Sequence, residues 1–174
     1  ISLMPDGTVE DARKAIDAAE KAQNQWERTP SIERAAYLTK IATGIRKREK
    51  ELTDIIVREG GKTQGLANVE VLFTADYMDY MAGWARRYEG EIIPSDRPHE
   101  SIFLFKRPIG VTTGILPWNF PFFLVARKAA PALITGNTIV IKPSQLTPEN
   151  AYVFAQIVEE AGLPAGVFNL VNGD

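Results

Sequence analysis

The sequence has 174 residues, 45% of them hydrophobic, with a formal net charge of −2, no cysteine and a single histidine. This length and hydrophobic content suit one globular domain, and the near-neutral charge argues against nucleic-acid or membrane partners. The lack of cysteine excludes disulfides and thiol catalysis by these residues and favours the cytoplasm, and His99 alone cannot build a multi-histidine metal site.

The first 90 residues have the periodicity of helices. Apolar residues at steps of three and four predict a helix to about residue 28, capped by Thr8 or Asp6. A second helix is predicted to start with Ser31 as its cap and to continue to the glycines at 60 and 61, and a third covers about residues 67–88. The apolar side of each helix is expected to be core.

Residues 91–109 predict a connecting segment with one strand. Residues 92–98 are rich in turn-forming residues and predict a turn. Residues 101–106 alternate loosely and predict a strand, which Pro108 restricts to a sheet edge or a strand end.

Residues 110–174 predict a parallel sheet. Buried strands are predicted over residues 110–116, 137–142 and 167–171, with helices over about 120–133 and 148–161 between them. Pro131 is expected to end or bend the last turn of the first helix. The alternation describes two βαβ units with right-handed crossovers, so the fold class is α/β: N-terminal helices followed by a partial parallel sheet.

Ligands of such sheets bind beyond the carboxyl ends of the strands, where the sequence places residues 117–121, 142–145 and 172–174. Neither a GxGxxG nor a GxxxxGK[ST] pattern occurs there, which argues against a standard Rossmann pyrophosphate turn and a P-loop. Residues 101–148 carry five basic and no acidic side chains. That run suits buried strands and an anionic ligand equally well.

Several side chains in these loops have two interpretations each. Asn119 lies between two prolines at a helix start, so it is either an N-cap or an amide donor aimed at a developing oxyanion. Lys142 ends an apolar strand and either extends into solvent or binds a ribose hydroxyl or phosphate. Ser144 or Thr147 is expected to cap the following helix. Arg127 follows Asn119 at helical steps and either points to the same side or forms an ion pair.

The sequence resembles the aldehyde dehydrogenase superfamily in the order and spacing of several motifs. They are Gly114-Ile-Leu-Pro-Trp-Asn-Phe-Pro121, Ala130-Pro-Ala-Leu133, Gly136-Asn-Thr138, Ile141-Lys-Pro-Ser144 and Leu163-Pro-Ala-Gly-Val-Phe-Asn169. The segment from Tyr80 to Gly90 is similar to the family's region before its oligomerisation strands. Phe73-Thr-Ala-Asp-Tyr77 and Pro121-Phe-Phe-Leu124 resemble the lactaldehyde and glycolaldehyde dehydrogenases of bacteria.

The resemblance implies a partial Rossmann-like NAD(P)-binding domain over residues 1–174, with 91–109 in the oligomerisation region and the catalytic domain absent. It implies oxidation of an aldehyde to an acid with NAD or NADP, through attack by a cysteine thiolate, hydride transfer and hydrolysis by a glutamate-activated water. By the family motifs, Asn119 donates to the oxyanion. The matched cofactor positions are Ile115, Leu116, Pro117, Trp118, Lys142, Ser144 and Gln145, and the substrate positions are Phe120, Leu124 and Arg127.

The sequence also departs from the family. Gln145 stands where a glutamate is common, which predicts better tolerance of NADP, and Arg127 predicts short, polar aldehydes as substrates. Without cysteine the 174 residues alone are expected to be inactive, and Ile1 suggests a cut into a longer chain. A homodimer or homotetramer is expected, with no metal. The alternative is a non-catalytic remnant that binds nucleotide or only assembles with other chains.

Overall fold

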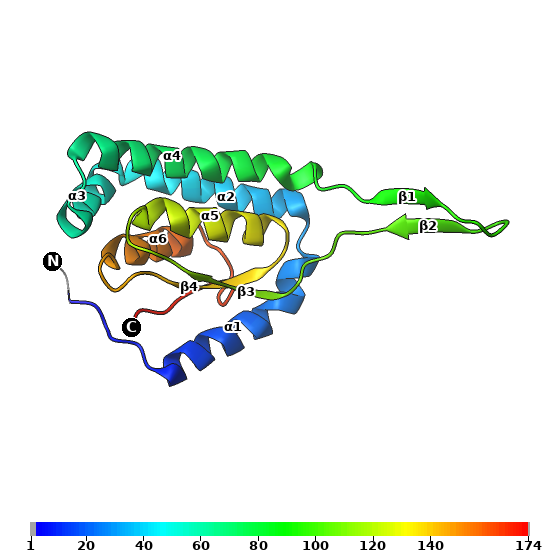
Figure 1. The fold of residues 1–174 in the computed structure, drawn as a ribbon, viewed down its shortest axis with the longest axis horizontal. Coiled ribbons are helices and arrows are strands. Elements are labelled where there is room, and N and C mark those ends of the chain that lie inside the picture. Colours follow the sequence, from blue (N-terminus) through cyan, green and yellow to red (C-terminus); the bar gives the residue numbers. More distant parts are fainter. Residues whose placement is uncertain (1–2, 174) are drawn as a thin grey trace.

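A computed structural model describes residues 3–173, and its elements lie in stacked layers (Figure 1). In chain order they are α1 (Val9–Arg28), α2 (Ser31–Lys47), α3 (Glu49–Gly60), α4 (Gln64–Ala82), the 3-10 helix η1 (Gly83–Arg86), β1 (Glu91–Pro94), β2 (Ser101–Leu104), β3 (Val111–Ile115), α5 (Pro121–Ile134), β4 (Thr138–Lys142), α6 (Glu149–Glu160) and β5 (Phe168–Leu170). Helix α1 covers one face of a small sheet. Helices α5 and α6 cover the other face, and α2 and α4 pack over them. This confirms the α/β class.

Helix α1 begins where the sequence predicts. The Thr8 hydroxyl accepts a hydrogen bond from the Asp11 N–H, and the Asp11 carboxylate accepts one from the Thr8 N–H, which completes a capping box. Farther along the helix, the Gln23 amide donates to the Gly136 carbonyl at 3.0 Å and accepts from the Thr138 N–H at 2.8 Å. These two bonds fix α1 to the start of the central strand.

The single long helix predicted over residues 31–60 is wrong, because α2 and α3 are separate. Arg48 joins them with φ −104° and ψ 19°, outside helical geometry. Its guanidinium pairs with Glu51 and with Glu160 of α6, and it donates to Gln156 at 2.9 Å. The helix therefore breaks at a residue that is neither Pro nor Gly, and this residue makes tertiary contacts with α6. The expected Ser31 cap is also wrong, since Pro30 is the N-cap and makes no side-chain bond.

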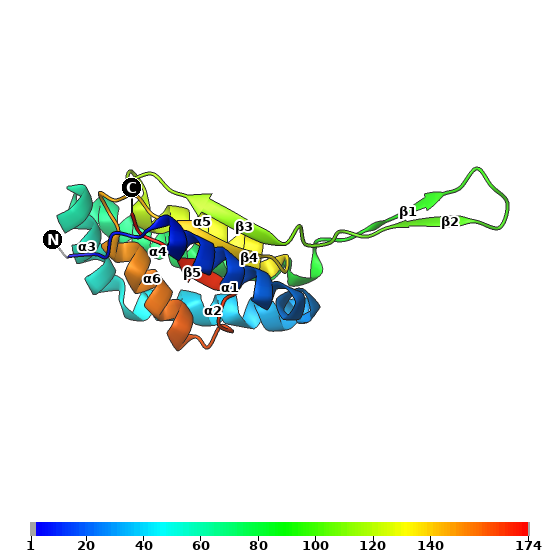
Figure 2. The ribbon, with the colours of Figure 1, turned by 90° about the horizontal axis from the view of Figure 1, so that it is seen from below.

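Residues 91–104 form an antiparallel hairpin that extends away from the helical layers in both views (Figures 1 and 2). The predicted strand at residues 101–106 is confirmed as β2, but the turn expected over 92–98 is partly wrong because Glu91–Pro94 is a strand. Pro94 is the last residue of β1, and β1 pairs with only one strand, so the position tolerates a residue without an N–H. The hairpin exposes a row of large apolar side chains: Ile92, Ile93, Ile102, Phe103, Leu104 and Phe105.

The second sheet has the strand order β3-β4-β5 and is parallel throughout, as predicted. Residues 138–141 of the central strand β4 are buried, which explains their continuous apolar sequence. The expectation that β3 is buried is wrong. In the described sheet β3 lies at an edge, with Thr113 and Ile115 exposed, the latter by 77%.

Helix α5 is the centre of the core. Its buried residues contact β3, β4, α4 and α6, and Phe122 meets Phe154 edge to face at 5.8 Å. Pro131 lies in the last turn of α5, as expected: the chain stays helical only to Ile134, although Pro131 cannot donate to the carbonyl one turn earlier. Among residues 3–173, no helix is both long and apolar enough to cross a bilayer.

Candidate functional site

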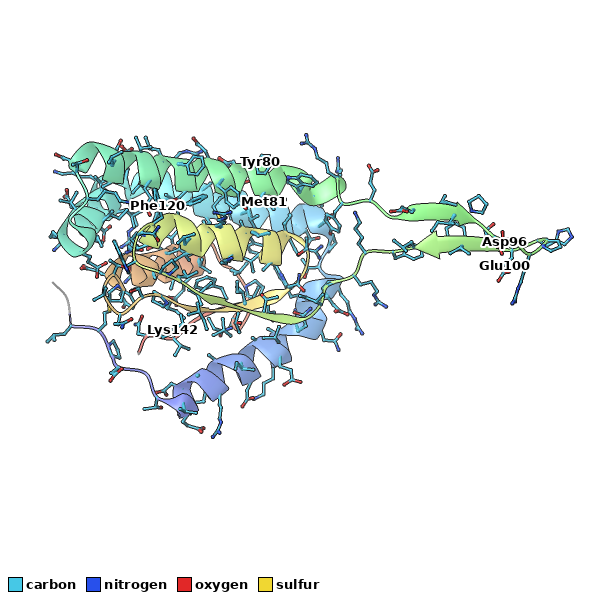
Figure 3. The ribbon with its side chains drawn as sticks, in the orientation of Figure 1. Tyr80, Met81, Asp96, Glu100, Phe120 and Lys142 are labelled. Atoms are coloured by element: carbon cyan, nitrogen blue, oxygen red, sulfur yellow. The ribbon has the colours of Figure 1, made fainter. Side chains whose placement is uncertain are left out.

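The carboxyl ends of β3 and β4 lie side by side. Ile115 pairs with Lys142 in the sheet register, and the Leu116 N–H donates to the Lys142 carbonyl at 2.9 Å. Figure 3 shows Phe120 and Lys142 at the end of the molecule opposite the hairpin tip. The loops after these strands, residues 116–121 and 143–148, therefore start from the same edge of the sheet, as predicted for a ligand-binding crevice.

A groove of about 310 Å³ lies between this sheet edge and α1 with the segment before it. Its lining includes the apolar side chains of Ile16, Ile115 and Val140 together with Lys142 and Asn172. The Asn172 side-chain oxygen is buried and accepts no hydrogen bond from the described residues. The groove combines apolar surface with the Lys142 ammonium group, which can accommodate an apolar ring together with ribose hydroxyls or phosphate.

The predicted cofactor residues are not all in this groove. Ile115 and Lys142 line it, and the Lys142 ammonium lies 3.4 Å from the Pro143 carbonyl oxygen. Leu116 is only 5% exposed and belongs to the core. Ser144 is 8% exposed, and its hydroxyl accepts from the Leu146 N–H at 3.2 Å, so it shapes the loop.

The remaining predicted positions of these loops lie on the surface. Pro117, Trp118 and Gln145 are exposed. The third loop of the crevice contributes Asn172 and Gly173, whereas Asp174 lies outside the described residues. The structure thus unites Ile115, Lys142 and Asn172 at one groove and leaves Trp118 and Gln145 accessible beside it.

Asn119 is not the N-cap of α5, so that interpretation is wrong. Phe120 holds the cap position and makes no side-chain bond. The first free N–H groups of the helix, those of Phe122 and Phe123, donate to the Glu70 carboxylate of α4 at 3.0 and 3.1 Å. The Asn119 side chain is exposed and makes no hydrogen bond to the described residues, so its amide is available to a ligand.

Helix α6 is capped in the same way from a distant helix. The expected caps, Ser144 and Thr147, are wrong. The Glu149 N–H donates to the Glu59 carboxylate of α3 at 3.0 Å, and the Asn150 amide donates to its other oxygen at 3.2 Å. Burial raises the pKa of Glu59 above its ordinary value, and these hydrogen bonds only partly offset that effect.

The predicted substrate residues Phe120, Leu124 and Arg127 follow one another at helical spacing from the N-cap of α5, a helix that packs beside aromatic side chains of α4. The Phe123 ring lies 4.7 Å from Phe73 and 5.4 Å from Tyr77. Burial raises the pKa of Tyr77, and the neighbouring Arg127 guanidinium partly offsets the rise. Arg127 forms no ion pair within residues 3–173, so the ion-pair interpretation is wrong for the described structure.

The sequence analysis did not assign the aromatic face of α4 to the site. Its members, at steps of three and four, are Phe73, Tyr77 and Tyr80, and the stripe continues to Trp84 in η1. This spacing is the sequence signal for the aromatic stripe, which lies beside the alanine-containing core face of the same helix. Phe73 and Tyr80 remain 53% and 58% exposed. Phe73 and Tyr77 thus form an aromatic cluster with Phe123 in the first turn of α5, which follows the Asn119 loop.

Comparison with known proteins places the sequence in one family. A sequence model described as the aldehyde dehydrogenase family matches residues 1–174. Lactaldehyde dehydrogenase of Escherichia coli is 72% identical over 173 residues, which are 99% of this chain and 36% of that protein. A 3,6-anhydro-alpha-L-galactose dehydrogenase of a Vibrio strain is 42% identical over 99% of this chain and 36% of its own length.

Solved structures agree. A structure of lactaldehyde dehydrogenase from Escherichia coli superposes with a TM-score of 0.96 at 73% identity, covering 97% of this chain and 35% of that one. A 3,6-anhydro-L-galactose dehydrogenase in complex with NAP superposes with a TM-score of 0.94 at 40% identity, with the same coverage. The chain spans only about a third of the length of the relatives it matches.

Proposed function

Because the chain belongs to the aldehyde dehydrogenase family, we propose that it forms the first part of the cofactor-binding domain of an NAD(P)-dependent aldehyde dehydrogenase. The reaction converts an aldehyde, water and NAD(P)⁺ into a carboxylic acid, NAD(P)H and a proton. The observation that carries the proposal is the joint placement, at neighbouring strand ends, of the Lys142 groove and the loop that carries Asn119. The 174 residues contain no cysteine, so the attacking thiol has to come from polypeptide outside them.

The cofactor is proposed to lie against the edge formed by Ile115 and Lys142. Lys142 supplies a positive charge and hydrogen-bond donors for ribose hydroxyls or phosphate, and Ile115 supplies apolar surface. Trp118 and Gln145 are exposed beside these residues and extend the contact. When bound, NAD(P)⁺ supplies the hydride acceptor of the reaction.

Asn119 is proposed to stabilise the charge that develops on the aldehyde oxygen. Its amide N–H is a fixed neutral donor, and the loop between Pro117 and Pro121 restricts the backbone that carries it. A donor of this kind acts in the transition state more than in the ground state, because the oxygen gains negative charge as the thiol attacks. Asn119 therefore raises kcat more than it tightens substrate binding.

The substrate is proposed to be a short, hydroxylated aldehyde such as lactaldehyde or glycolaldehyde. Phe120 at the N-cap of α5, Leu124 and Arg127 of α5, and Tyr77 of α4 are proposed to form one wall of the substrate site. The Arg127 guanidinium and the Tyr77 hydroxyl offer hydrogen bonds to a substrate hydroxyl. A long alkyl chain would instead have to desolvate the Arg127 charge.

Arg127→Leu is expected to shift the preference from hydroxylated to alkyl aldehydes. The variant removes the charge that an alkyl chain would desolvate, so the ratio of kcat/KM for glycolaldehyde to that for hexanal should fall about tenfold or more. The measurement is a pair of steady-state assays on the full-length gene product. Lys128→Leu, an adjacent exposed cation on the same helix, serves as the control. An unchanged ratio in the Arg127 variant would exclude the residue from the substrate site.

Gln145→Glu is expected to shift the cofactor preference towards NAD⁺. A carboxylate accepts both adenine-ribose hydroxyls and repels the 2′-phosphate of NADP⁺, whereas the neutral amide tolerates it. The ratio of kcat/KM for NAD⁺ to that for NADP⁺ should rise about tenfold, a difference of about 1.4 kcal/mol. Strong selectivity for NAD⁺ in the parent protein that the substitution leaves unchanged would contradict this assignment.

The function is tested with the full-length gene product that contains this sequence. It is incubated with glycolaldehyde or lactaldehyde and either cofactor, and reduced cofactor and carboxylic acid are quantified. Equal amounts of the two products support the proposal. Cofactor binding without acid formation favours the alternative, a nucleotide-binding or assembly protein. We also propose a homo-oligomer, a dimer or tetramer, on the basis of the exposed apolar hairpin. A cytoplasmic location is proposed because the 174 residues contain no cysteine.

A further inference from the structure

Two charged residues from the helical layer hold the loop that carries Asn119. Lys62 follows Gly61, whose φ of 64° ends α3, and its side chain is only 16% exposed. Glu70 lies on α4 with a fully buried side chain. The Lys62 ammonium and one Glu70 carboxylate oxygen are 2.5 Å apart. A buried carboxylate of this kind is stable only with a charged partner and further hydrogen bonds.

Lys62 and Glu70 contact the chain at Asn119 and at the residues that follow it. The Lys62 ammonium donates to the Asn119 carbonyl at 3.0 Å and lies 3.9 Å from the centre of the Phe120 ring. The second Glu70 oxygen accepts the N–H groups of Phe122 and Phe123 at 3.0 and 3.1 Å. The backbone is thus fixed at residue 119 itself and at the helix start that follows.

Helix capping alone does not account for this arrangement. Glu59 caps α6 through the Glu149 N–H with no lysine bound to it. Capping α5 needs only the Glu70 carboxylate, yet Lys62 reaches past it to the Asn119 carbonyl and the Phe120 ring. The extra contact acts on the residue whose amide is exposed and makes no hydrogen bond to the described residues. A catalytic donor has to be held within about 0.5 Å of its productive position.

We propose that Lys62 and Glu70 are positioning residues, which fix the Asn119 backbone so that its amide N–H points at the aldehyde oxygen. Neither residue touches the substrate; both act through Asn119. The inference rests on the proposed function, because it needs a reaction in which Asn119 donates to a developing oxyanion.

The test is Lys62→Met in the full-length gene product, a change that keeps the length of the side chain and removes the ammonium group. Misplacing a catalytic group by about 1 Å can cost roughly 100-fold in rate, so kcat is expected to fall about 10- to 100-fold. The Kd for the cofactor, measured by titration without substrate, should stay within about twofold, because Lys142 and its groove are untouched. Lys62→Arg, which still donates, should recover part of kcat.

The matched control is Asp76→Asn, a carboxylate on the same helix that pairs with Arg46 and has a 70% exposed side chain. This variant should keep kcat within about twofold, since exposed ion pairs contribute little. If Lys62→Met does not fold, the same measurements are made on Glu70→Gln. That variant keeps an oxygen for the two N–H groups and loses the charge that binds Lys62.

A double-mutant cycle with Asn119→Ala separates positioning from a general structural role. If Lys62 acts through Asn119, Lys62→Met should lower kcat by less than threefold in the Asn119→Ala background. Losses that multiply would overturn the proposal, and so would an unchanged kcat in Lys62→Met alone when the parent protein is active. A parent protein without dehydrogenase activity would instead contradict the proposed function itself.

Discussion

Replacing Asn119 with alanine is expected to lower kcat for aldehyde oxidation about 100- to 1,000-fold. The estimate follows from the loss of one preorganised donor to a developing oxyanion, which costs about 3–4 kcal/mol of barrier. Because the Asn119 amide makes no hydrogen bond to the described residues, its removal leaves no protein group unsatisfied. The free energy of unfolding should therefore change by less than about 0.5 kcal/mol, as for other surface substitutions.

Steady-state kinetics of the full-length gene product measure this effect, and the cofactor Kd is determined in parallel. Asn119→Asp serves as the control, because a carboxylate of similar size accepts but does not donate and should lose about as much kcat as alanine. A kcat within threefold of the parent in the alanine variant would exclude the oxyanion role. A loss confined to cofactor affinity would place Asn119 in the nucleotide site instead.

Replacing Arg34 with alanine is expected to lower the free energy of unfolding by about 3–5 kcal/mol, because it removes a buried hydrogen-bonding centre. Arg34 is 4% exposed. Its guanidinium donates to the Ile134 carbonyl at 3.1 Å, to the Tyr88 hydroxyl at 2.6 Å, and to the carbonyls of Glu27 and Thr29. One side chain therefore joins the ends of α1 and α5 to the segment before the hairpin, and its loss leaves buried carbonyls unpaired.

Urea-induced unfolding of the full-length gene product measures this change. Tyr88→Phe is the matched control, since it removes one of the bonds and keeps the ring, and it should cost about 1 kcal/mol. Arg34→Lys should fall between the two, because an ammonium group cannot reach acceptors in the directions that the planar guanidinium does. A loss below about 1 kcal/mol for Arg34→Ala would show that the three segments are held together without it.

The parts of the fold that were predicted correctly depend on local sequence signals. The Thr8 cap lies next to the helix it caps, and the alternation of strands and helices over residues 110–174 predicted a parallel sheet, which the structure confirms. The wrong predictions of the caps of α5 and α6 involve partners far apart in sequence. Phe122 and Glu70 are 52 residues apart, and Glu149 and Glu59 are 90 apart. Periodicity within one helix carries no information about such caps.

The candidate site also has a part that could be predicted from the sequence and a part that could not. That the loops over residues 117–121 and 142–145 start from the same edge of the sheet followed from the rule for parallel strand ends, and the pairing of Ile115 with Lys142 confirms it. The burial of Leu116 and Ser144 depends on how the loops pack against the core, which spacing does not reveal. Tyr77 joins the wall only because α4 and α5 lie side by side. Which helices pack against each other depends on the tertiary structure, so it cannot be predicted from the periodicity of a single sequence.

The most direct test is a chimera in which this chain replaces the matching part of a related enzyme. In Escherichia coli lactaldehyde dehydrogenase, the 36% of the sequence that matches is replaced by this chain, and the remainder of that protein is kept. If these 174 residues supply a working cofactor crevice and oxyanion donor, the folded chimera should oxidise lactaldehyde with kcat within about tenfold of the intact enzyme, and Asn119→Ala should abolish most of that rate. A folded chimera that binds cofactor without oxidising the aldehyde, or that keeps full activity without Asn119, would contradict the account.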